Sequence, residues 1–315
     1  MSNGNEMVLF NRDTQAALHE FQRTNGLTLK QLGQKLGRNE GFVNKYLNSV
    51  PEGDIASFEE RITDMLKREA RKRSWESVYF QTDAADACFS VFDLVREASD
   101  IGLIHGPAGY GKSVAFRKYL EDHRTVIGFT AMEGSGSQYD VMRGISSCLD
   151  MRRWNPRETK LADYLFGKLK GSERCVLIDN AQRLYLSGFR WMMDFHDNTG
   201  VSFVLIGNPE VMDKLNGNDQ LSSRIGIQVD ISTQLGKGEW LDVAADRKVA
   251  AMWPKAQREI GILAREAARK PGHLRTLDKQ LRIAITLCET DSYRGKFAKA
   301  FADARNMIGA SNEKD

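Results

Sequence analysis

A glycine-rich segment at residues 106–113 constrains the fold more than any other part of this sequence. It follows the apolar run 101–105 and precedes a segment of helical character. Glycines allow a backbone to wrap phosphate groups with its N–H groups at the positive end of a helix. The pattern G-x-x-x-x-G-K-S between a strand and a helix therefore predicts a nucleotide-phosphate site. Its residues are Gly106, Pro107, Ala108, Gly109, Tyr110, Gly111, Lys112 and Ser113.

Three side chains are expected to serve the outer phosphates and a metal ion. Lys112 supplies a positive charge, and the hydroxyl of Ser113 is a Mg²⁺ ligand in such loops. A second apolar run, CVLID, ends at Asp179. That carboxylate is placed to hold Mg²⁺ through water. The expected ligands are therefore ATP and Mg²⁺.

The middle of the chain has the pattern of an α/β domain. Between residues 76 and 232, short apolar runs alternate with helical segments, which is typical of a parallel sheet with crossover helices. Unbroken apolar character suits strands that are buried on both faces. Residues 233–315 carry no convincing strand and are expected to be helical. The expected strands are 101–105, 125–130, 174–179, 201–207 and 225–231.

Residues 1–65 predict a small all-α domain in front of the α/β domain. The segment 28–48 divides into two helices around Gly37, which can take the left-handed conformation of a tight turn. Gly33 is small where the second helix would cross closely. This spacing favours a helix-turn-helix that binds DNA, although a helical hairpin for protein contacts is the alternative. The expected major-groove contacts are Arg38, Asn39, Asn44 and Lys45.

Two further segments are basic, although the net charge is only +3. Residues 66–75 carry five basic residues against one acid and are expected to link the two domains. Residues 255–305 carry twelve Lys or Arg against six Asp or Glu. Residues 66–75 suit contacts with DNA phosphates and a solvated helical surface equally well. The charge of 255–305 favours sequence-independent contacts with double-stranded DNA, with a solvated lid as the alternative.

The remaining composition argues against several classes of protein. The cysteines are scattered without a C-x-x-C pair, which argues against a zinc site or a disulfide framework and for a reducing compartment. No long apolar run and no signal peptide are present. We expect a cytoplasmic protein, in a bacterium or a phage-infected host, with no membrane partner. The cysteines are Cys88, Cys148, Cys175 and Cys288.

The order of these parts resembles the AAA+ ATPases. GPAGYGKS and CVLID are similar to the Walker A and Walker B motifs of that family. The resemblance makes Asn208, after the run VLIG, a sensor of the terminal phosphate. It makes Arg224 an arginine finger that reaches a neighbouring subunit, and the sequence places no obvious acid beside it. In the segment KPGHLRTL, it makes Arg275 a second sensor on a helical lid over 233–315.

With a helix-turn-helix domain in front, the chain is similar over most of its length to the phage Mu B type of transposition protein. The similarity includes WNPRETKLADYLFGKLKG at 154–171. It implies an ATPase that binds double-stranded DNA with little sequence preference in its ATP state. It also implies self-association into rings or helical filaments and delivery of target DNA to a transposase, with hydrolysis dislodging the protein.

One position departs from the AAA+ pattern. The Walker B aspartate is normally followed by a glutamate that polarises the attacking water, whereas Asp179 is followed by Asn180. An amide can orient water but cannot accept its proton. We therefore expect slow hydrolysis, unless another acid such as Glu133 supplies the base. Asn180, Asn208 and Arg224 are the expected catalytic side chains.

Two other functions remain open from the sequence alone. The chain could be an ATP-gated transcription regulator that acts through its helix-turn-helix, or a helicase-loader-like AAA+ protein. Whether DNA affinity depends on base sequence or on ATP-driven assembly separates the regulator from the transposition ATPase.

The phosphate loop generates a direct prediction. Lys112→Ala removes the charge that meets the outer phosphates, so nucleotide affinity should collapse, together with any ATP-dependent DNA binding. Titration with a fluorescent nucleotide measures the effect. Unchanged binding by the variant would contradict the assignment of the site.

Overall fold

The computed structural model describes residues 11–48, 54–76, 79–149, 158–235 and 238–308. The chain divides into two compact units, Met1–Tyr79 and Phe80–Asp315. A search of the described helices for one that is long and apolar enough to span a membrane finds none.

In the described part of the first unit, four helices surround one small apolar core. Thr28 begins the second helix with a capping box that also uses Gln31, and Gly37 ends it with a left-handed φ of 65°. Leu32 and Tyr46 are fully buried in the core. The predicted pair of helices around Gly37 is therefore present. The four are α1 (Arg12–Thr24), α2 (Leu29–Leu36), α3 (Glu40–Asn48) and α4 (Ile55–Glu76).

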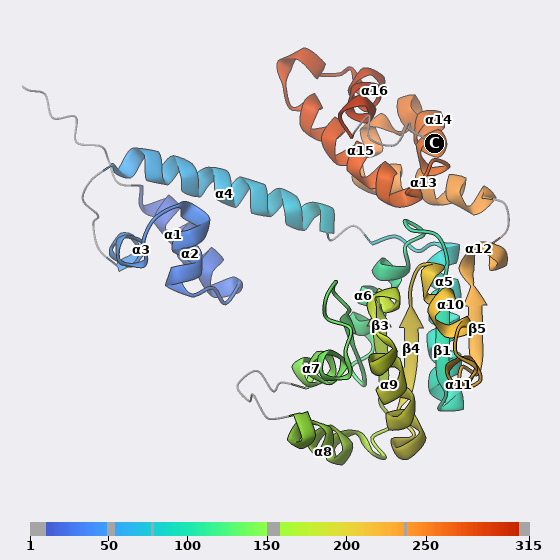
Figure 1. The fold of residues 1–315 in the computed structure, drawn as a ribbon. Helices are drawn as coiled ribbons and strands as arrows, with labels where there is room; N and C mark the ends of the chain where they lie inside the picture. Colours follow the sequence, from blue (N-terminus) through green and yellow to red (C-terminus); the bar gives the residue numbers. More distant parts are fainter. Residues whose placement is uncertain (1–10, 49–53, 77–78, 150–157, 236–237, 309–315) are drawn as a thin grey trace, which may run out of the picture. The chain divides into compact units, whose positions relative to one another are not determined.

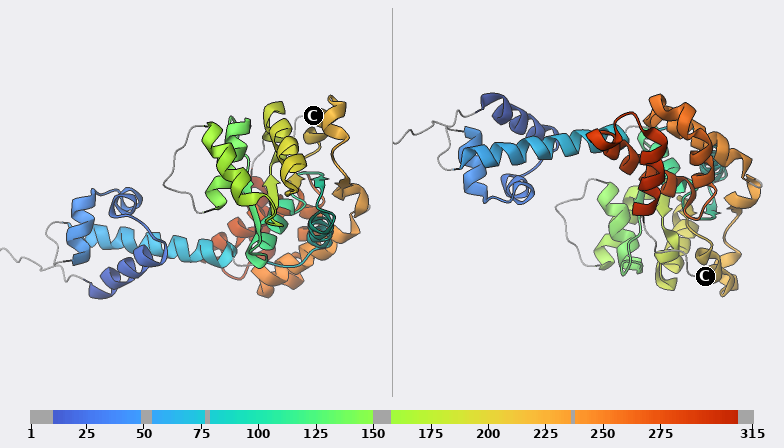
Figure 2. Two further views of the ribbon diagram at one scale, coloured as in Figure 1. Left: turned by 90° about the horizontal axis from the view of Figure 1, so that it is seen from below. Right: turned by 90° about the horizontal axis from the view of Figure 1, so that it is seen from above.

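Helix α4 contains both the end of the predicted first domain and the predicted linker. Phe58 and Ile62 pack in the core with α1–α3, and among the described side chains of α4 the last one in that core is Leu66. Figures 1 and 2 show α4 as one continuous helix. The helix nevertheless continues to Glu76, because Lys, Arg, Glu and Ala are good helix formers. The expected boundary at residue 65 therefore falls inside a helix, and the basic segment 66–75 is helical.

The second unit is built on a five-stranded sheet in the order β2-β3-β4-β1-β5, and all its strand pairs are parallel. Figure 1 shows β3, β4, β1 and β5 side by side in this order. Every residue of β1, β3 and β4 is buried, as their unbroken apolar runs predicted. All the strands expected from the sequence are present. They are β1 (Ile101–His105), β2 (Val126–Thr130), β3 (Cys175–Asp179), β4 (Ser202–Ile206) and β5 (Ile227–Asp230).

Helices cover both faces of this sheet. On β3, Leu177 belongs to the core with α5 and α6, while Val176 and Ile178 belong to the core with α7, α8 and α9. This alternation places one apolar layer on each face. The helices are α5 (Asp83–Ala98), α6 (Lys112–Asp122), α7 (Gln138–Cys148), α8 (Glu158–Leu169), α9 (Leu186–Thr199), α10 (Glu210–Asn216), α11 (Asp219–Ser222) and α12 (Ile231–Gln234).

The helical lid completes the unit and shares its core. Leu241, Leu277 and Phe301 of the lid are buried in the same apolar cluster as the residues of α5 and α6. The α/β fold with a parallel sheet and a helical lid, preceded by an all-α region, is therefore confirmed. The lid helices are α13 (Glu239–Met252), α14 (Gln257–Ala268), α15 (His273–Cys288) and α16 (Phe297–Met307).

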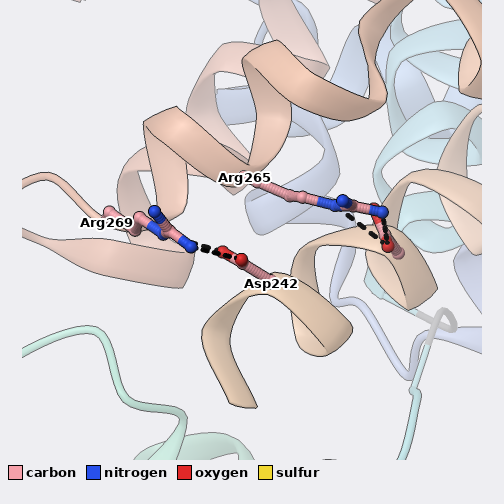
Figure 3. Close-up of polar contacts among 4 residues, drawn as sticks. Asp242, Arg265 and Arg269 are labelled. Carbon is pink, nitrogen blue, oxygen red and sulfur yellow. Dashed lines mark hydrogen bonds and ion pairs between the residues drawn. The ribbon is translucent and has the colours of Figure 1, made fainter. Parts of the chain in front are cut away.

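Two ion pairs join α13 to α14 on the surface of the lid (Figure 3). Asp242 pairs with Arg269, and Asp246 accepts a hydrogen bond of 2.9 Å from Arg265 Nε. Each helix places its two charges four residues apart, so that they lie on one face. Both pairs lie at the surface, where solvent screening leaves an ion pair with little effect on stability.

The turn between α2 and α3 generates a prediction about the first unit. A Cβ at Gly33 would lie 2.5 Å from the carbonyl oxygen of Arg38, so Gly33→Ala should destabilise this unit by about 1–3 kcal/mol. Gly41 on α3 is the matched control, because its nearest atom would lie 3.6 Å away. Gly41→Ala should stabilise the helix by about 0.5–1 kcal/mol. Hydrogen exchange of the α2 and α3 amides in the whole chain measures both effects, and equal changes would contradict the close approach.

Candidate nucleotide-binding site

The phosphate loop joins the end of β1 to the start of α6. Gly106, Gly109 and Gly111 have φ angles of 151°, 89° and 93°, all in the region that favours glycine. Gly111 is the N-cap of α6, so unpaired N–H groups of the first turn face the loop. A Cβ at Gly109 would overlap the backbone oxygen of Gly272. The loop therefore has the backbone of an anion cradle and lies directly against a turn of the lid.

Lys112 turns into this loop. Its Nζ donates hydrogen bonds to the carbonyl oxygens of Gly106 at 2.7 Å and Pro107 at 2.8 Å, and the residue is only 8% exposed. Burial lowers the pKa of Lys112 to about 8; the positive charge of Arg275 acts in the same direction, while Asp179 opposes it. A phosphate group in the loop would give this buried ammonium the anionic partner that carbonyl dipoles only partly replace.

Ser113 and Asp179 meet as the sequence predicted. The hydroxyl of Ser113 donates to Asp179 Oδ1 at 3.1 Å, and Asp179 is 5% exposed. Burial raises the pKa of Asp179, although the hydrogen bonds from Ser113 and from the backbone of Asn180 lower it. A hydroxyl and a carboxylate are the oxygen ligands that Mg²⁺ prefers, so the pair fits that ion. When bound, Mg²⁺ would neutralise phosphate charge at this edge of the sheet.

The backbone conformation of residue 180 explains why an asparagine suits this position. Its φ and ψ are 59° and 39°, in the left-handed region, where it caps the short 3₁₀ helix Ala181–Arg183. Among residues with a side chain, asparagine and aspartate tolerate this region best. The amide at this position therefore suits the turn after β3.

Asn208 lies beyond the end of the neighbouring strand β4. Its side-chain Oδ1 is buried, and the structure gives it no hydrogen-bond partner among the described residues. Such an atom is costly unless a ligand or water satisfies it. Asn208 and Glu133 both line a polar cavity of about 320 Å³, but Glu133 is exposed at its rim.

The lid contacts the phosphate loop through an aromatic cluster that sequence reasoning missed. The ring of Tyr110 lies edge-on to Trp240 at 4.9 Å and to His273 at 4.7 Å, measured between centroids. Trp240 comes from α13 and is 5% exposed, and His273 begins α15. Three residues that lie far apart in the sequence are thus in contact at the loop, and no local sequence pattern predicts that contact.

The two predicted arginines have different surroundings. Arg275 lies exposed in the first turn of α15, near enough to Lys112 to influence its pKa. Arg224 is 40% exposed and pairs with Asp197 at 3.0 Å and Asp194 at 3.4 Å, both on α9. The sequence places no acid beside Arg224, because these two acids lie about 30 residues away along the chain and only the fold brings them close.

In the first unit, three of the predicted DNA-contacting side chains have local contacts. The guanidinium of Arg38 lies 5.1 Å from the ring centroid of Phe42, and Asn39 Oδ1 accepts from the backbone N–H of Phe42 at 2.7 Å. Asn44 accepts a hydrogen bond from Asn48 on the same helix. Asn44 and Lys45 are exposed on α3.

Comparison with known proteins identifies one family domain and several relatives. Residues 95–215 match the AAA domain family. The chain is 24% identical over 283 residues to the ATP-dependent target DNA activator B of Escherichia phage Mu, covering 86% of this chain and 88% of that protein. It is 24% identical over 252 residues to the Mu-like prophage FluMu DNA transposition protein B of Haemophilus influenzae, covering 78% and 87%.

Solved structures give weaker likenesses. A variant of Thermotoga maritima RuvB has a TM-score of 0.46 at 14% identity, covering 72% of this chain and 68% of that one. NtrX from Brucella abortus in complex with ATP has a TM-score of 0.44 at 12% identity, covering 83% and 63%. The sequence relatives confirm the expected resemblance: residues 95–215 match the AAA domain family, and the curated relatives that match over most of the chain are B transposition proteins of Mu-like phages.

Proposed function

We propose that this protein is an ATPase that binds double-stranded DNA in its ATP state and delivers it as a target to a transposase. The observation that carries the proposal is the buried Lys112, which is held by loop carbonyls beside the Ser113–Asp179 pair. The name of the phage Mu relative, ATP-dependent target DNA activator B, supports DNA as the partner. That name favours a transposition role over a transcription regulator or a helicase loader.

The loop and the lid supply a route from nucleotide to assembly. Entry of phosphates would draw Lys112 away from the carbonyls of Gly106 and Pro107. The same loop is in contact with the lid through Gly109 and Tyr110. A change in the loop therefore reaches the lid directly. The lid in turn offers a surface through which copies of the chain can meet in a ring or filament.

The lid also offers cations for sequence-independent DNA contacts. Some of its basic side chains are held in ion pairs with lid carboxylates, among them Arg265, Arg269 and Arg282. Others are exposed, and many copies on one duplex would sum their individually weak phosphate contacts. The exposed set includes Lys255, Arg258, Lys279 and Arg305.

Assembly on DNA provides one test. We propose that Arg224 leaves its exposed pair with Asp194 and Asp197 to meet a phosphate in a neighbouring copy, since such a surface pair is worth only about 0–1 kcal/mol. Electron microscopy with ATP and random-sequence duplex should show rings or filaments for the wild type and dispersed protein for Arg224→Ala.

Asp197→Asn is the matched control for this test. It breaks the closer ion pair but keeps the arginine, so this variant should assemble normally. If Asp197→Asn disperses like Arg224→Ala, the ion pair within the chain is what matters, and the role in a neighbouring site is wrong.

Slow hydrolysis provides a second test. A positioned general base is worth about 10² to 10⁴ in rate, so Asn180→Glu should raise steady-state phosphate release with DNA present. The left-handed backbone at this position disfavours glutamate, and Asn180→Gln carries nearly the same backbone cost without a base. Equal rates for the two variants would show that a missing carboxylate does not limit turnover.

A further inference from the structure

Gln182 connects the ends of two neighbouring strands. It lies in the 3₁₀ helix that follows β3, and its side-chain Oε1 accepts a hydrogen bond of 3.3 Å from the backbone N–H of Asn208, beyond the end of β4. The preceding N–H, that of Gly207, still bonds to Ile104 on β1. The Gln182 side chain thus takes over as acceptor where the backbone ladder of the sheet stops.

Two neighbours hold this arrangement. A Cβ at Gly207 would lie 3.0 Å from Gln182 Oε1, so a glycine there leaves the room through which the glutamine side chain passes. Lys214 of α10 donates hydrogen bonds from Nζ to the carbonyl oxygens of Gln182 and Leu184, at 3.0 Å for the latter. Because one ammonium bonds to two carbonyls of the turn, the backbone that carries Gln182 is well fixed.

Asn208, whose backbone Gln182 supports, also has a buried side-chain atom without a hydrogen-bond partner among the described residues. Gln182 and Asn208 line the same polar cavity of about 320 Å³. The buried Oδ1 of Asn208 has no hydrogen-bond partner among the described residues, although its backbone N–H is satisfied by Gln182. The backbone of Asn208 is therefore anchored while its side chain is left to bind something else.

We propose that Gln182 is a positioning residue for ATP hydrolysis, which holds Asn208 through its backbone N–H so that the Asn208 amide oxygen accepts a hydrogen bond from the attacking water. The proposal rests on the proposed ATPase function. It does not make Gln182 a base, because an amide cannot accept the proton of water. The side chain contributes an acceptor oxygen at a fixed place, and small misplacements of groups in an active site lower rates strongly.

The test separates an oxygen acceptor from a side chain that merely fills space. Gln182→Met keeps the length of the side chain without the oxygen, whereas Gln182→Glu keeps the oxygen that accepts from Asn208. Under single-turnover conditions with DNA, Gln182→Met should hydrolyse ATP at least about tenfold more slowly than the wild type. Its dissociation constant for a fluorescent ATP analogue should stay within about twofold of the wild-type value. The loss of an interaction that is made chiefly in the transition state lowers the rate but not the ground-state affinity.

Gln182→Glu should recover most of the rate at saturating ATP, and Gln257→Ala, an exposed glutamine at the start of α14, is the surface control. Wild-type rates in Gln182→Met, or a loss in Gln182→Glu as large as in Gln182→Met, would overturn the proposal. ATP binding by the wild type without any hydrolysis would also overturn it. If the wild type binds no nucleotide and resembles Lys112→Ala, the proposed function itself fails.

Discussion

The candidate site depends on the parallel register of three neighbouring strands. Ile104 of β1 pairs with Ile206 of β4, and Asp179 of β3 pairs with the same Ile206. The three strands therefore end at one level, and the segments that follow them emerge side by side. In open α/β sheets, ligands bind at this carboxyl edge. The phosphate loop, the acid after β3 and the amide after β4 come together for this reason, although they lie far apart in the sequence.

Burial then sets the chemistry of these groups. Lys112 and Asp179 are both nearly inaccessible to solvent. Burial lowers the pKa of Lys112 and raises the pKa of Asp179, and so favours the neutral form of each. Nearby charges and the hydrogen bonds to Asp179 offset these pKa shifts only in part. A bound phosphate and a divalent cation would favour the charged forms of both, so ligand binding is coupled to the ionisation of the site. The same loop also touches the lid, at Gly109 and Tyr110.

The turn after β3 shows how backbone geometry and catalysis can compete. A left-handed conformation at Asn180 suits an amide better than a glutamate. Two residues later, Gln182 returns toward the sheet and anchors Asn208. The proposed slow turnover and the proposed positioning role thus arise from the same short turn.

The sequence by itself determined the parts whose signals are local. Each strand was predictable from its apolar run, the phosphate loop from its glycines with Lys112 and Ser113, and Asp179 from its place at the end of a run, because burial on both faces and phosphate binding demand those residues in that order. Only the tertiary structure decided which distant groups meet: Arg224 with the acids of α9, Tyr110 with Trp240 and Gln182 with Asn208. Those contacts depend on packing between elements, and the spacing of residues along the chain carries no information about it.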